Sequence, residues 1–158
     1  METKPSAPIE QTPRVLRLLK RLYRTCIDGE RGFSDAARDV ESTEHRIVLV
    51  RYAEQRAAFA DAIAEAIARL GAVVDPTGTP AGELHRGWLD VKRATTGREQ
   101  PILDECARGE DAAMRRYADA MKSAEMSSLR PGEKRMIEQQ YEEIVSAHEH
   151  MQRLARSC

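Results

Sequence analysis

The sequence is poor in aromatic residues, which make up only 4% of its 158 residues, and its three cysteines are widely spaced. An odd and scattered set of cysteines does not form the disulfide framework of a small secreted protein. Charge of one sign is not in excess either, because 25 basic residues face 26 acidic ones. The formal charge of -1 argues against nucleic acid or an anionic membrane surface as an electrostatic partner of the whole molecule.

Long apolar runs are also missing. No segment approaches the roughly 20 consecutive apolar residues that span a bilayer. Residues 1–13, METKPSAPIEQTP, lack the apolar core of a secretory signal. We therefore expect a cytoplasmic protein without a membrane segment, and we expect residues 1–11 to be a disordered leader.

Helix-forming residues dominate what is present, with Ala, Glu, Arg, Lys and Leu throughout the chain. Apolar residues recur at steps of three and four, which is the pattern of amphipathic helices. Thr12-Pro13 is a helix start and Gly71 a helix stop. The periodicity predicts four long helices, over about residues 13–40, 43–70, 101–124 and 131–155.

The clearest break in the pattern is GAVVDPTGTPAG, at residues 71–82. A short helix over about residues 80–95 follows, and Trp88 would anchor it to the bundle, with His85 on the same face. A bundle with one long crossover, here residues 71–100, has the ferritin-like topology. The sequence thus predicts an all-α, antiparallel, ferritin-like four-helix bundle, formed as a single domain over residues 12–157.

Short segments of the chain resemble each other in two pairs. Cys26-Ile27-Asp28-Gly29-Glu30 is echoed by Cys106-Ala107-Arg108-Gly109-Glu110, and Tyr52-Ala53-Glu54 by Tyr141-Glu142-Glu143. This spacing indicates two similar helix hairpins. Glycine inside a helix costs about 1 kcal/mol relative to alanine. We therefore expect helix backbones to approach each other closely at Gly29 and Gly109.

Five strings extend the pattern over nearly the whole chain: CIDGERGFSDAA, YAEQRAAFADAI, GELHRGWLDVKRA, ILDECARGEDAAMRRY and QQYEEIVSAHEHM. Together they resemble a bacterial family of ferritin-like four-helix-bundle proteins whose function is undefined. The resemblance implies the bundle fold. It implies no established substrate, reaction or cofactor.

Ferritin-like proteins often bind two metal ions with one glutamate from each of two helices and a Glu-x-x-His pair from each of the other two. By this pattern the lone glutamates are Glu30 and Glu110. The Glu-x-x-His pairs are incomplete, because Ala57 follows Glu54 and Ser146 follows Glu143 at the histidine position. An iron or manganese site would draw its ligands from Glu30, Glu110, Glu54, Glu143 and His148.

The alternative to a metal site is a buried polar network of Glu30, Glu110, Arg56 and His148. Arg56 lies on the inner stripe of the second helix, where a cation would repel a metal ion. A buried carboxylate needs a partner, and a guanidinium in the same layer supplies it. We favour this network over the metal site.

The remaining candidates have simpler explanations. Cys26 and Cys106 occupy matching apolar positions and are expected to pack as small hydrophobic side chains rather than to form a disulfide. His150 points away from His148 on a helix and is expected to be solvated, and Cys158 to be exposed. The basic side chains of the first helix are expected to form a solvated face: Arg14, Arg17, Lys20, Arg21 and Arg24.

Signatures of catalysis are missing, since there is no glycine-rich phosphate loop, no Ser-His-Asp pattern and no Cys-x-x-Cys pair. The sequence predicts a non-catalytic ferritin-like bundle without a cofactor. It would act through association with itself, as a dimer or other homo-oligomer, or with another protein. The alternative is a metal-binding bundle or oxidase that uses iron or manganese.

Overall fold

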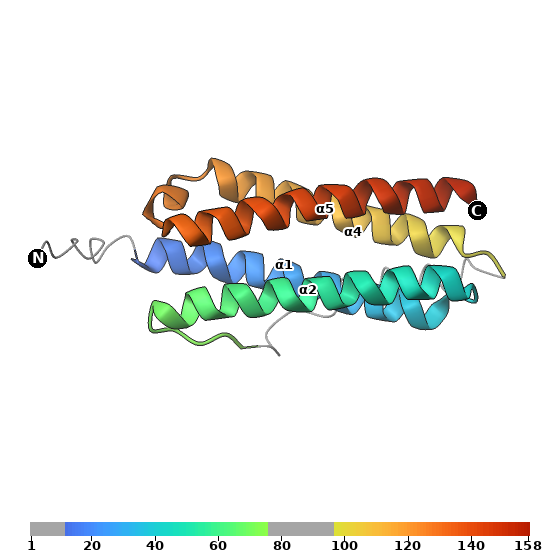
Figure 1. Cartoon of the computed structure of the whole chain (residues 1–158), viewed down its shortest axis with the longest axis horizontal. Helices are drawn as coiled ribbons and strands as arrows, with labels where there is room; N and C mark the ends of the chain where they lie inside the picture. The colour runs from blue at the N-terminus through green and yellow to red at the C-terminus, as the bar shows by residue number, and fades with distance from the viewer. Residues whose placement is uncertain (1–11, 76–96) are drawn as a thin grey trace, which may run out of the picture.

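The computed structural model describes residues 12–75 and 97–158, which form four long helices and one short 3-10 helix (Figure 1). The helices are α1 (Thr12–Asp39), α2 (Thr43–Arg69), α4 (Gln100–Lys122) and α5 (Pro131–Ser157), with η1 (Ala124–Ser128) before α5. The long helices end within two residues of the ranges expected from the sequence. The leader at 1–11 and the crossover helix at 80–95, with His85 and Trp88, lie outside the described residues.

Short polar residues and turn residues set the helix ends. The Ser42 hydroxyl accepts a hydrogen bond from the backbone N–H of His45 and so caps α2. Gly71, with φ of 79°, takes the left-handed conformation that ends α2. Pro131 opens α5, and the Arg130 N–H donates to Glu133 Oε2 at 2.9 Å. These signals explain why the helix bounds are readable from the sequence.

The helices pair as two hairpins, α1 with α2 and α4 with α5, and the hairpins pack along their length (Figure 1). Helices α2 and α4 run in the same direction, so the chain must travel the length of the bundle between them. A single long connection between the second and third long helices is the ferritin-like arrangement. The predicted all-α bundle is therefore confirmed. No helix among the described residues combines the length and the apolar character that a bilayer crossing requires.

The apolar core is divided into two clusters. One cluster contains the residues of α1 up to Cys26 and of α2 from Phe59 onward. The other contains the residues of α1 from Phe33 onward and of α2 up to Ala53. The gap between them, at the middle of the bundle, is where Arg56 and Glu110 lie buried. The polar residues of this layer form the candidate site.

Candidate functional site

An ion pair joins α2 to α4 in the middle of the bundle. Arg56 Nη2 donates a hydrogen bond to Glu110 Oε2, and the side chains are only 1% and 2% exposed. Burial raises the pKa of Glu110 above its ordinary value, and the charge and hydrogen bond of Arg56 act in the opposite direction. The guanidinium is thus the group that neutralises this buried carboxylate.

Arg56 also contacts a glutamine and two aromatic rings. Its Nη1 donates to Gln55 Oε1 at 2.6 Å, and Gln55 Nε2 donates to Glu143 Oε2 at 2.7 Å. Its guanidinium carbon lies 5.8 Å from the ring centre of Phe33 and 5.3 Å from that of Phe59, within cation–π distance. A hydrogen-bonded chain therefore runs from the half-buried Glu143 on α5, through α2, to Glu110 on α4.

The Arg56 side chain passes beside Gly29 of α1. A Cβ at Gly29 would lie 3.1 Å from Arg56 Cγ and 3.2 Å from Cδ, which is a tight contact. At Gly109 a Cβ would meet nothing within 4 Å. The expectation of close backbone approach at both glycines is wrong. Gly29 makes room for a side chain, and Gly109 lies on the exposed side of α4.

A second chain of buried polar side chains lies next to this layer. The Cys26 thiol lies 3.0 Å from Tyr117 Oη, which donates to Gln140 Oε1 at 2.7 Å. Gln140 Nε2 in turn lies 3.4 Å from the carbonyl oxygen of Phe59. Side chains from α1, α4 and α5 and a backbone group of α2 thus meet here.

Burial decides the chemistry of this second chain. It raises the pKa of Cys26 to about 11 and the pKa of Tyr117 well above its ordinary value. Both groups therefore stay protonated at neutral pH, and a protonated thiol is a poor nucleophile. Cys106, on the other hairpin, is a free thiol in the other core cluster, and burial raises its pKa as well.

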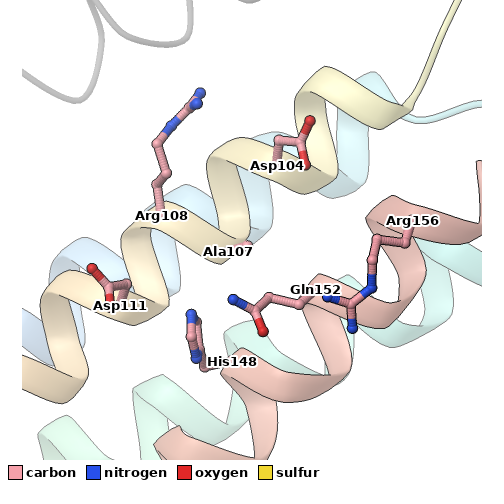
Figure 2. Close-up of a pocket in the computed structure, with 7 residues that line it drawn as sticks. All are labelled: Asp104, Ala107, Arg108, Asp111, His148, Gln152 and Arg156. Carbon is pink, nitrogen blue, oxygen red and sulfur yellow. The ribbon is translucent and has the colours of Figure 1, made fainter.

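Three of the expected site residues lie outside the polar layer. Glu30 is half-buried and lines a surface groove between α1 and α2, together with the exposed Glu54. His148 lines a different groove, between α4 and α5, where it points from α5 toward α4 near Asp111 (Figure 2). Of the four residues of the expected network, the structure brings together Arg56 and Glu110.

The fit to a metal centre can be judged from these positions. In residues 12–75 and 97–158, no group of three or more His, Cys, Asp or Glu side chains converges on a point where an ion could be held. The Glu110 carboxylate faces Arg56, and Glu143 faces Gln55. The described residues therefore do not fit the six-ligand pattern of a two-metal site.

Other features of the sequence reading also need correction. His150 is only partly solvated, because it is half-buried and its Nδ1 lies 2.7 Å from Tyr52 Oη. Burial, with Arg153 and Arg51 nearby, lowers the pKa of His150. On α5, Gln140 is buried among the core residues, and the neighbouring Tyr141 is half-buried.

Sequence reasoning missed Gln55 as a member of the polar layer, and Tyr117 and Gln140 as members of the second polar chain. Gln140 did carry a signal, because it lies three residues after Ile137 and four before Ile144 on the buried face of α5. A polar side chain at such a position requires a buried partner. Gln55 carried no comparable signal, because it lies beside the apolar stripe, next to Arg56, and is half-buried.

The sequence and the fold of the chain can now be compared with those of known proteins. The family described as a domain of unknown function, DUF2383, matches residues 14–123. The chain belongs to this family. The match runs from α1 to the end of α4. It confirms the resemblance to a family of undefined function, and no functionally curated protein matches the chain.

Among solved structures, the chain is similar to a Mycobacterium smegmatis protein described as a mutant of Dps1. The TM-score is 0.73 and the sequence identity is 17%, and the match covers 94% of this chain and 99% of the other. At an identity this low, the structural match shows a shared fold alone. The ferritin-like architecture of this DUF2383 protein is therefore established.

Proposed function

We propose that this DUF2383 protein is a non-catalytic, ferritin-like bundle that acts through association with itself or with another protein. The observation that carries the proposal is the buried Arg56–Glu110 ion pair. Glu110 lies on the helix and at the position where the ferritin-like pattern would place a metal ligand. Here its charge is balanced by a side chain of the protein.

The physical argument rests on charge and burial. A divalent ion near Glu110 would also lie near the guanidinium, and the repulsion between two cations in a partly buried site amounts to several kcal/mol. The guanidinium cannot lose its charge, because arginine stays protonated in proteins. Releasing Glu110 for a metal would also leave Arg56 buried without its partner, which is costly.

The experiment is a titration of the purified protein with Fe²⁺ or Mn²⁺, followed by calorimetry and absorbance, with elemental analysis of the protein as isolated. We expect no stoichiometric metal and no dependence on Glu110. Matched variants are Glu110→Gln, which removes a candidate ligand, and Glu138→Gln, an exposed glutamate of α5. Folding of each variant is checked by its melting temperature.

The alternative is a metal-binding bundle or oxidase that uses Glu30, Glu110, Glu54, Glu143 and His148 with iron or manganese. It requires Arg56 to leave the layer, since Glu110 is held by it. Metal bound at one or two ions per chain, and lost in Glu30→Ala and Glu110→Ala but kept in Glu138→Gln, would establish the alternative and overturn our proposal.

A further inference from the structure

A surface groove between the second half of α1 and the first half of α2 combines an apolar floor with an ordered set of charges. Its floor contains Ala37, Val50, Ala53 and Ala57. Val50 is 41% exposed, and Ile47, one helical turn before it, is 57% exposed. These are two of the four large hydrophobic side chains that lie exposed among the described residues.

The charges of the groove lie at its two ends. On α1, Glu30 and Arg38 stand four residues before and after Ser34, and all three line the groove. On α2, Arg46 and Glu54 stand four residues before and after Val50, and these line it as well. Because α1 and α2 are antiparallel, Arg38 and Arg46 share the end near the hairpin loop, and Glu30 and Glu54 share the other end.

We propose that this groove is the contact surface between two copies of the chain, related by a two-fold axis that lies in the contact plane and crosses α1 and α2 at the level of Ser34 and Val50. A two-fold axis turns the groove end for end, so the acidic end of one copy lies over the basic end of the other. Glu30 then faces Arg38 of the second copy, and Glu54 faces Arg46 of the second copy. The same rotation places Val50 over Val50 of the second copy and covers the exposed apolar floor.

This inference rests on the proposed function, in that it names the partner and the surface for association. A second copy is favoured over an unrelated partner because the groove is complementary to itself. An all-acidic or all-basic groove would repel its own copy, whereas this one carries two charges of each sign in opposite halves.

The first test reverses one charge of a rim pair and measures dimerisation by sedimentation equilibrium. Glu30 is half-buried at the edge of the groove, and the Arg38 side chain is 73% exposed with a local pair to Asp35, so neither change reaches the buried core. By symmetry each reversal acts at two contacts, and Glu30→Arg and Arg38→Glu are each expected to raise the dimer Kd about tenfold or more. The double variant restores the pair with inverted sign, and its Kd returns toward that of the wild type.

Exposed charges of α5 supply the matched controls, Glu142→Arg and Arg135→Glu, which lie outside the groove. These variants are expected to dimerise as the wild type does. A dimer that weakens equally in the controls, or that ignores the groove reversals, would overturn the proposed interface while leaving self-association intact.

The second test fixes the orientation. Chains with Val50→Cys, carrying Cys158→Ser to remove the exposed thiol, are oxidised. The expected product is a disulfide-linked dimer of Val50→Cys chains, with none when Val50→Cys is replaced by Ser146→Cys on the exposed face of α5. A protein that stays monomeric at every concentration would overturn the inference. The metal titration would still test the non-catalytic assignment separately.

Discussion

The two Cys-x-x-Gly-Glu segments of the chain have similar sequences but different environments. In α4, Glu110 is buried against Arg56 and Gly109 is exposed with open space around it. In α1, Glu30 faces a surface groove and Gly29 is the glycine that Arg56 packs against. Arg56 thus pairs with the glutamate of one segment and packs against the glycine of the other.

The cause of this difference lies in the partner helices. The offset of 89 residues that relates Tyr52 to Tyr141 relates Arg56 to Val145. Helix α2 therefore brings a cation to the middle layer, and α5 brings an apolar side chain at the matching position. A single guanidinium neutralises one buried carboxylate, and the other glutamate of the echo lies where water can reach it. The comparison shows that an internal repeat can preserve the fold while its core charges diverge.

The largest expected effect comes from removing the cation. Arg56→Met leaves Glu110 buried without a partner, which lowers the free energy of unfolding by about 3–5 kcal/mol at neutral pH. The deficit shrinks as the pH falls through the raised pKa of the unpaired Glu110, because the protonated side chain buries no charge. Urea unfolding between pH 5 and 8 measures both effects. Arg56→Met with Glu110→Leu should recover most of the loss, and a double variant as unstable as the single one would contradict the pairing.

The two glycines provide the next largest contrast. Gly109→Ala places a methyl group in open space and adds helix propensity, so it should raise the free energy of unfolding by about 0.5–1 kcal/mol. Gly29→Ala forces the methyl group against the Arg56 stem, which its ion pair holds in place, and should cost about 1–2 kcal/mol. Thermal and urea melts of the two variants decide this. Equal effects at both positions would show that the two segments are equivalent after all.

A smaller loss is expected in the second polar chain. Tyr117→Phe removes the hydroxyl that the Cys26 thiol and Gln140 contact, and it leaves buried groups unpaired at a cost of about 1–2 kcal/mol. Tyr141→Phe, at a half-buried position, serves as the control and should be nearly neutral. Urea unfolding of the pair measures the difference. If the control were destabilised as much, the hydrogen bonds of Tyr117 would carry no special weight.

The smallest effect concerns the end of the bundle. The Glu99 carboxylate accepts hydrogen bonds from the backbone N–H groups of Glu41 and Ser42 and contacts His45 Nδ1. Burial at this site opposes ionisation of Glu99, but these hydrogen bonds and His45 together lower its pKa below 4.5. A lowered carboxyl pKa contributes stability above the unfolded value and loses it as the pH falls through the folded one. Glu99→Ala should therefore cost about 1 kcal/mol at neutral pH, with the difference from wild type vanishing in acid.

The sequence predicted the helices and the bundle because periodicity and capping residues are local signals. It also placed Arg56 on an inner stripe, which the structure confirms. It could not distinguish Glu30 from Glu110, since both lie four residues after a buried cysteine and their burial depends on which helix faces them. For the same reason the contact of His150 with Tyr52 was missed, because it joins helices 98 positions apart in the chain.

The ionisation of Glu110 tests the central claim most directly. Carboxyl-carbon NMR of selectively labelled protein, assigned with Glu110→Gln, follows its titration in the wild type and in Arg56→Met. We predict that Glu110 is ionised at pH 7 in the wild type, with a midpoint above 4.5, and that the midpoint moves upward when Arg56 is removed. A Glu110 that is already neutral at pH 7 in the wild type, or a midpoint that Arg56→Met leaves unchanged, would contradict the account.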